Sequence, residues 1–102
     1  APRPSSKEPG DILALRREAG AWLRARREEL DLTQGELARL VGSDYYSFIS
    51  QIESGRGKIP SDRYRSWAGA LQVEPRVLVE KLLRYYDPPV FNILFGDHKT
   101  SE

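Results

Sequence analysis

The sequence lacks most of the residues that would point to an enzyme, a metalloprotein or a membrane protein. Its 102 residues include no cysteine, which excludes a disulfide framework, a thiol nucleophile and a cysteine zinc site. His98 is the only histidine and has no partner at ligand spacing, so we expect no metal site, no cofactor and no catalytic residue. The apolar runs are too short for a membrane helix or a signal peptide. We therefore expect a cytoplasmic protein that is not an enzyme and has no membrane partner.

A strong excess of charge is also missing. Sixteen basic and fifteen acidic residues leave a formal net charge of +1. Proteins that bind nucleic acids through overall charge are far more basic. The composition permits DNA binding without arguing for it, so any evidence for function has to come from local sequence patterns.

The chain divides into three segments. Residues 1–10 are rich in proline and polar side chains, which predicts a disordered arm. Residues 11–86 carry helical periodicity throughout and form the expected domain. Residues 87–102 are predicted to form a short apolar helix or turn and then a polar tail.

Within the domain, start and stop signals predict five helices. Asp11 is suited to cap the first, whose apolar stripe ends near Asp31, although Gly20 leaves open whether one helix or two are present. The second begins with a capping box, Thr33 to Glu36, and ends at Gly42. The third spans 45–54, the fourth is capped by Ser61, and the fifth has Pro75 at its first position. The side chains expected to face the core are Leu37, Ala38, Val41, Phe48, Ile49, Ile52, Tyr64, Trp67, Ala68, Leu71, Val77, Leu78, Leu82 and Tyr85.

Two short helices joined by a tight turn that contains glycine form a helix-turn-helix unit. Leu32-Thr33-Gln34-Gly35-Glu36-Leu37-Ala38, followed by Ile49-Ser50-Gln51-Ile52-Glu53-Ser54-Gly55, resembles the XRE family of regulators, which includes the lambdoid phage repressors and Cro. The resemblance extends roughly over 22–83. It implies an all-α fold of five helices of the phage-repressor type, here with an extended first helix and a short C-terminal apolar segment.

The resemblance also implies a function. A member of this family would be a bacterial or phage-like transcriptional regulator, more often a repressor than an activator. It would bind a two-fold operator in double-stranded DNA as a homodimer, because one recognition helix reads only a few base pairs. No ligand-binding domain is evident, so we expect no small-molecule effector.

The resemblance assigns DNA-binding roles to particular residues. Gln34 resembles the residue that binds a phosphate and steadies the recognition helix. Arg56 and Lys58 follow that helix and would contact phosphates, with arginines of the first helix as further candidates. Aligning on Ile49 places Tyr46, Ser47, Ser50 and Gln51 toward the major groove, with Tyr45 near the DNA backbone.

The chemistry of these side chains fits base reading. Gln51 can pair with an adenine edge through two hydrogen bonds, Ser47 can serve several bases, and Tyr46 can contact a thymine methyl group or a phosphate. Between Gly42 and Ile49 the chain has six residues where the family commonly has five, which leaves the register at the start of the recognition helix open by one position. Each residue also has a purely structural alternative, as a surface aromatic, a helix-start residue or a solvated loop cation.

The family resemblance predicts one structural ion pair as well. Arg27 lies seven residues before Gln34, and Glu53 directly follows Ile52. In the family, residues at these two places link the first helix to the end of the third. We expect Arg27 and Glu53 to lie within salt-bridge distance and to be shielded from water, the alternative being two ordinary surface charges.

The C-terminal segment concentrates five large apolar side chains in six positions, 90–95. Asp87 can cap a short helix there and Pro88 can occupy its first position. Such a segment either folds back over the fourth and fifth helices near Trp67 and Leu71, or packs across a two-fold axis against a second chain. Exposed apolar patches usually mark interfaces, so we favour a dimer interface formed by Phe91, Leu94 and Phe95.

A second class of function shares the same motif. XRE-type modules include antitoxins and coactivators whose main partner is a protein. Such a role needs a partner-binding segment outside the five helices, and 1–10 and 88–95 are the two candidates.

Overall fold

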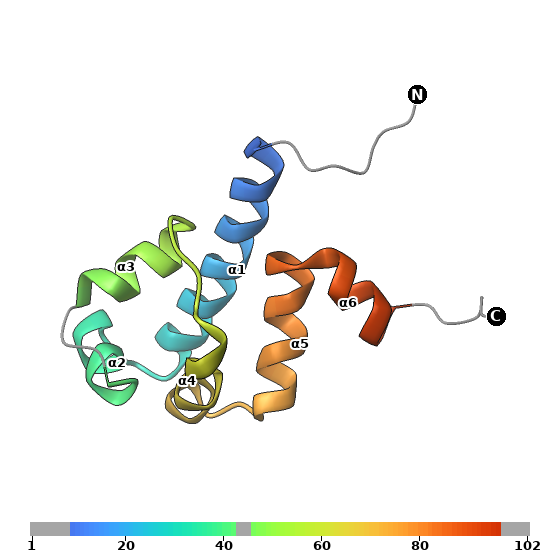
Figure 1. The fold of residues 1–102 in the computed structure, drawn as a ribbon. Helices are drawn as coiled ribbons and strands as arrows, with labels where there is room; N and C mark the ends of the chain where they lie inside the picture. The colour runs from blue at the N-terminus through green and yellow to red at the C-terminus, as the bar shows by residue number, and fades with distance from the viewer. Residues whose placement is uncertain (1–8, 43–45, 97–102) are drawn as a thin grey trace.

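A computed structural model of the protein describes residues 9–42 and 46–96. These residues form six α-helices and one 3-10 helix (η1) and contain no strand, so the predicted all-α fold is confirmed. The elements, shown in Figure 1, are α1 (Pro9–Glu29), α2 (Gln34–Leu40), α3 (Tyr46–Ser54), η1 (Ser61–Arg63), α4 (Tyr64–Leu71), α5 (Pro75–Tyr86) and α6 (Pro88–Phe95).

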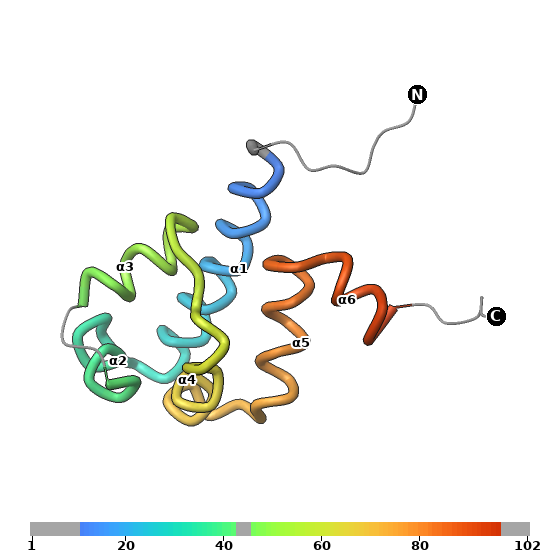
Figure 2. Tube along the Cα trace, viewed as in Figure 1, coloured from blue at the N-terminus to red at the C-terminus, as the bar shows by residue number. Residues whose placement is uncertain are grey.

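The helices are arranged around α1. In Figure 1, α1 rises through the centre, with α2 and α3 on one side of it and α5 on the other. α1 packs against both α3 and α5. α6 lies beyond α5, on the side of the molecule away from α3. The tube in Figure 2 follows the segment between α3 and α4, which descends from the end of α3 beside α1.

A single helix occupies the region where Gly20 had left two helices open. α1 begins at Pro9, because proline is tolerated in the first turn of a helix, and Asp11 therefore lies within that turn. The prediction that Asp11 caps the helix was wrong, because Asp11 is the third residue of α1. Residues 9 and 10 of the predicted arm belong to α1 as well. The rest of the arm, 1–8, lies outside the described residues.

The core is apolar, and Trp67 is its largest fully buried side chain. Trp22, Tyr64 and Tyr85 pack against the core while remaining half-buried. One inward prediction was wrong: Val77 is 47% exposed, because Leu78 and Leu82 form the buried stripe of α5 and Val77 lies to one side of it. The buried apolar residues are Ala19, Leu23, Leu37, Ala38, Val41, Ile49, Ile52, Ile59, Trp67, Ala68, Leu71, Leu78 and Leu82.

Most helix ends lie where capping residues, proline or glycine predict them. The fourth helix differs: Ser61 begins the 3-10 turn η1 after Pro60, and α4 starts only at Tyr64, so the predicted capping role of Ser61 was wrong. α1 and α4 end without glycine. Asp31 and Gln72, each with φ of 57°, take the left-handed conformation that commonly ends helices.

An arginine of α1 closes the end of α4. Arg26 donates hydrogen bonds from Nε to the carbonyl of Leu71 at 2.8 Å and from Nη2 to that of Gln72 at 3.2 Å. A cation stabilises the partial negative charge at a helix C-terminus. Arg26 therefore fixes the position of α4 relative to α1.

The C-terminal apolar segment, predicted as a short helix or turn, is a helix. Asp87 is the N-cap of α6 and accepts a hydrogen bond from the backbone N–H of Val90 at 3.4 Å, and Pro88 is the first helical residue. α6 packs against α5, yet none of its residues is buried. Within the described residues, no helix combines the length and apolar character needed to cross a membrane.

Candidate nucleic-acid interface

The second helix begins with a complete capping box. The Thr33 side chain accepts a hydrogen bond from the backbone N–H of Glu36 at 3.0 Å, and the Glu36 carboxylate accepts one from the backbone N–H of Thr33 at 2.8 Å. Gly42, with φ of 81°, follows the end of this helix. Both signals were predicted from the sequence and are confirmed. They define the start and the end of α2.

The third helix has one apolar and one polar side. Ile49 and Ile52 are fully buried and hold α3 against α1 and α2. The predicted groove-facing residues lie on its other side and are all exposed: Tyr46, Ser47, Ser50 and Gln51. Tyr46 is the first residue of α3 and is 64% exposed. Tyr45 lies outside the described residues, as do the other turn residues, 43 and 44.

The predicted ion pair between α1 and α3 is present. Arg27 donates from Nε to Glu53 Oε2 at 2.7 Å and from Nη2 to Oε1 at 3.1 Å. Both side chains are shielded from water, with 10% and 4% of their surface exposed. The hydrogen bond to Glu53 raises the pKa of Arg27, outweighing the opposing effect of burial. The guanidinium also donates from Nη1 to the carbonyl of Leu32 at 2.7 Å, so it holds the chain that leads into α2.

Gln34 joins the same carboxylate. Its side-chain amide donates to Glu53 Oε1 at 3.0 Å, which connects the start of α2 to the end of α3. An amide nitrogen carries two hydrogens, and this hydrogen bond uses one of them, while the Gln34 side chain is half-buried. Glu53 thus accepts hydrogen bonds from residues of α1 and α2 while belonging to α3.

The segment after α3 presents Arg56 and Lys58 to solvent. Its backbone is anchored by Ile59, whose side chain is buried and whose N–H donates to the Tyr86 hydroxyl at 3.2 Å. Burial raises the pKa of Tyr86 to about 12, so the phenol stays protonated at neutral pH. The Lys58 ammonium lies 5.8 Å from the centre of the same ring. These contacts hold the backbone of the segment that carries Arg56 and Lys58 in place directly after α3.

Two glycines bring α1 unusually close to the end of α3. A Cβ atom on Gly20 would lie 2.2 Å from the carbonyl oxygen of Glu53. A Cβ atom on Gly55, whose φ is 89°, would lie 2.7 Å from Cγ of Arg17. The sequence pattern did not single out Arg17, and the only signal available was an unexplained glycine in the middle of a helical stripe.

The described residues contain no group of three or more His, Asp or Glu side chains that could hold a metal ion. The arrangement is instead a helix-turn-helix DNA-binding domain: a capped second helix, a third helix with a buried apolar side and an exposed polar side, and cations beside it. Residues 23–78, more than half of the chain, match a family model described as Helix-turn-helix. A search of the curated proteins finds no match.

The chain therefore belongs to the helix-turn-helix family of the XRE, or lambda-repressor-like, type. It is a DNA-binding transcriptional regulator of that type. This family is regulatory and not a family of enzymes.

Proposed function

We propose that the protein is a repressor that binds a two-fold operator as a homodimer, with the exposed side of α3 in the major groove. The observation that carries this proposal is the segregation of α3, in which Tyr46, Ser47, Ser50 and Gln51 are exposed opposite buried Ile49 and Ile52. An α-helix fits the major groove, where each base pair presents a distinct pattern of donors and acceptors.

In this proposal each residue has a separate task. Gln51 reads an adenine edge, Ser47 and Ser50 contact neighbouring bases, and Tyr46 reaches a thymine methyl group or a phosphate. Gln34, Arg56 and Lys58 bind phosphates and set the position of the protein on the duplex. Tyr45, directly before α3, is assigned to the DNA backbone by the family resemblance alone.

The test has two steps. Selection from a randomised duplex library should yield an inverted repeat whose half-site centres are about 34 Å apart, or a multiple of that distance. On the selected duplex, Gln51→Ala should cost ~1–3 kcal/mol and relax base preference at one position of each half-site. Ser66→Ala, an exposed polar residue on α4, is the control and should leave the mobility shift unchanged. If Gln51→Ala left both the affinity and the base preference unchanged, this register of the recognition helix would be refuted.

Dimer formation is assigned to α6. Ile93 and Leu94 are 71% and 56% exposed, and no residue of the helix enters the core. Phe91 and Phe95 lie on the same helix with ring centres 5.6 Å apart. The alternative is that this segment folds back over α4 and α5 and completes the core near Trp67 and Leu71. It is met only in part, since α6 packs on α5 but contributes no buried residue. Phe91, Leu94 and Phe95 therefore remain the proposed interface.

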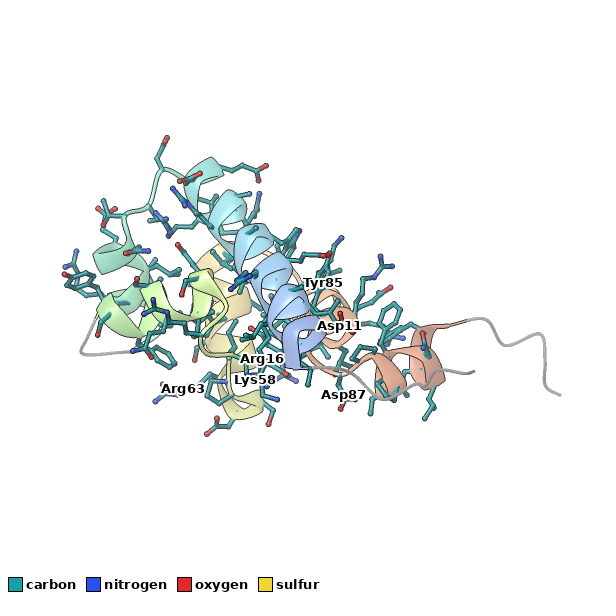
Figure 3. All side chains as sticks on the ribbon, turned by 90° about the horizontal axis from the view of Figure 1, so that it is seen from above. Asp11, Arg16, Lys58, Arg63, Tyr85 and Asp87 are labelled. Atoms are coloured by element: carbon teal, nitrogen blue, oxygen red, sulfur yellow. The ribbon has the colours of Figure 1, made fainter. Side chains whose placement is uncertain are left out.

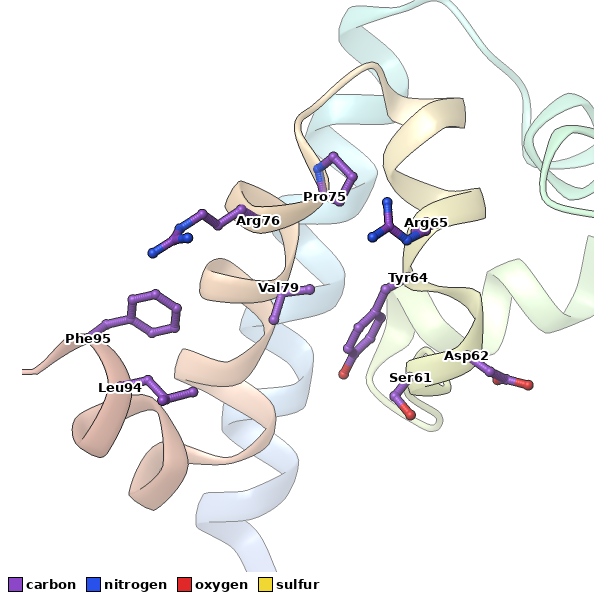
Figure 4. Close-up of a pocket in the computed structure, with 9 residues that line it drawn as sticks. All are labelled: Ser61, Asp62, Tyr64, Arg65, Pro75, Arg76, Val79, Leu94 and Phe95. Atoms are coloured by element: carbon purple, nitrogen blue, oxygen red, sulfur yellow. The ribbon is translucent and has the colours of Figure 1, made fainter.

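A groove beside α6 favours a second candidate function, a module that binds another protein. Figure 4 shows this groove, of about 700 Å³, between η1 and the start of α4 on one side and α5 and α6 on the other. Tyr64, Val79 and Phe95 are among its lining residues, with Arg65 and Arg76 at its rim. A chain that shows no sequence preference on any duplex, yet binds a protein through this groove, would belong to that second class.

A further inference from the structure

Four cations lie on α1 and on the segment that follows α3, two elements that meet where Arg17 packs on Gly55. Arg16 and Arg17 belong to α1, and Arg56 and Lys58 belong to the segment after α3. We call this set the α1–loop basic cluster. Within residues 9–42 and 46–96, the salt bridges involve Arg24, Arg26 and Arg27, and no member of the cluster pairs with a carboxylate.

The cluster follows from the packing of the backbone. Arg17 passes directly over Gly55, where a Cβ atom would lie 2.7 Å from Arg17 Cγ and 2.9 Å from its backbone nitrogen. One turn further along α1, Gly20 makes a similar approach to the carbonyl of Glu53. The two glycines therefore hold Arg17 beside the chain that carries Arg56.

The other two members converge on Tyr86. Lys58 lies over its ring, and Arg16 is near enough for its positive charge to oppose the rise in the pKa of this tyrosine. Figure 3 shows Arg16 and Lys58 on the same side of the molecule. The Tyr86 hydroxyl also holds the backbone at Ile59. The first helix and the loop thus present their cations from one fixed framework.

Grouped cations repel one another, and the repulsion is relieved when an anion binds between them. The phosphate backbone of DNA is such an anion, and Arg56 and Lys58 already lie next to the helix that enters the groove. Arg16 and Arg17 extend this positive surface away from α3 along α1.

We propose that Arg16 and Arg17 bind a phosphate of the DNA backbone adjacent to the phosphates bound by Arg56 and Lys58, so that α1 forms an additional backbone contact outside the recognition helix. This inference rests on the DNA-binding function of α3 and adds a contact that reads no sequence. It requires neither a two-fold operator nor a repressor role.

The test uses the full chain and a 30-base-pair duplex of random sequence, which reports the phosphate contacts without requiring the operator. Each phosphate contact contributes about 0.9 to the slope of log K against log salt concentration. The double variant R16A/R17A removes one phosphate contact and should therefore lower the magnitude of this slope by about 0.9 for each bound chain, whereas R16K/R17K should retain it, because lysine keeps the charge.

The double variant R65A/R76A is the matched control, since it removes two exposed arginines that line the groove between α4 and α5. It should leave the slope unchanged. An unchanged slope in R16A/R17A, with its helical circular dichroism retained, would overturn the proposal, and so would an equal decrease in the control.

Preference for the selected operator over the random duplex should be the same in R16A/R17A and in the parent. If the parent protein bound the selected and the random duplex with equal affinity, the proposed operator would be refuted, while the test of the Arg16 and Arg17 contact would still stand.

Discussion

Arg27, Glu53 and Gln34 form the most buried polar group of the described domain, and their energetics differ from those of a surface pair. A buried charge loses its hydration, and the attraction of its partner compensates for that loss only while both partners are present. Removing one side chain leaves the other buried without compensation. The same carboxylate also receives the hydrogen bond of Gln34, so its position affects α2 as well.

We expect Arg27→Ala to lower the free energy of unfolding by ~3–5 kcal/mol. Urea denaturation followed by circular dichroism measures this. The control is Arg24→Ala, which removes a pair at 3.0 Å with Glu28 whose side chains are 63% and 55% exposed. Exposed pairs contribute about 1 kcal/mol or less. If both substitutions cost the same, the buried pair has no special role in stability.

The sequence revealed these residues unevenly. The capping box of Thr33 and Glu36 could be predicted because all its atoms come from four consecutive residues. Arg27 and Glu53 could be paired only through the family resemblance, since they are 26 positions apart. The proximity of Arg17 to Gly55 depends on how two helices cross, and no local pattern encodes that crossing.

At the level of helices, the contact between α1 and α3 depends on a residue that is unfavourable in an isolated helix. Glycine in a helix interior costs roughly 0.5–1 kcal/mol relative to alanine. At Gly20 this cost is offset because the backbone of α3 occupies the space of a side chain. The same residue had left open whether α1 is one helix or two, because helix propensity alone does not register the contact that glycine permits.

Gly20→Ala should therefore destabilise the protein by ~1–3 kcal/mol, the usual effect of overpacking, even though alanine is the better helix former. Gly69→Ala is the matched control: Gly69 lies within α4, and a Cβ atom there meets nothing within 4 Å. It should stabilise by ~0.4–1 kcal/mol. Thermal unfolding of the two variants should thus shift in opposite directions. A stabilised Gly20→Ala protein would mean that α1 and α3 separate easily.

Other helix boundaries show where local rules were insufficient. Ser61 is a favourable capping residue, yet Pro60 begins a 3-10 turn that delays α4 until Tyr64. Val77 was expected to face inward because it is apolar, but helical geometry leaves room in the core for only one stripe of α5. Apolar periodicity and helix start and stop signals identified the correct elements, and packing decided which of their faces are buried.

For the molecule as a whole, we expect α6 to be needed for dimer formation and not for folding. The core contains no residue of α6, so the domain has its buried side chains without this helix. A chain truncated after Asp87 should therefore keep its helical circular dichroism and be monomeric at micromolar concentration, where we expect the full chain to be a dimer. Light scattering measures the mass. A folded, dimeric truncation would exclude α6 as the interface, and an unfolded one would assign α6 an intramolecular role.

A point substitution tests the same interface without truncation. Leu94→Asp places a charge on α6 and should abolish the dimer. Leu40→Asp is the matched control, because Leu40 of α2 has the same exposure, 56%, in a different helix. It should leave the dimer intact.

The carboxylate shared by α1, α2 and α3 has a consequence for the kinetics of DNA binding. Because Arg27 and Gln34 hold Glu53 in the free protein, the C-terminal end of the recognition helix is already oriented when the duplex arrives. Association then requires no rearrangement at that end, and its rate depends on diffusion and on attraction by the surrounding cations. We therefore expect differences among DNA sites to appear in the lifetime of the complex, which determines how long a bound site stays occupied.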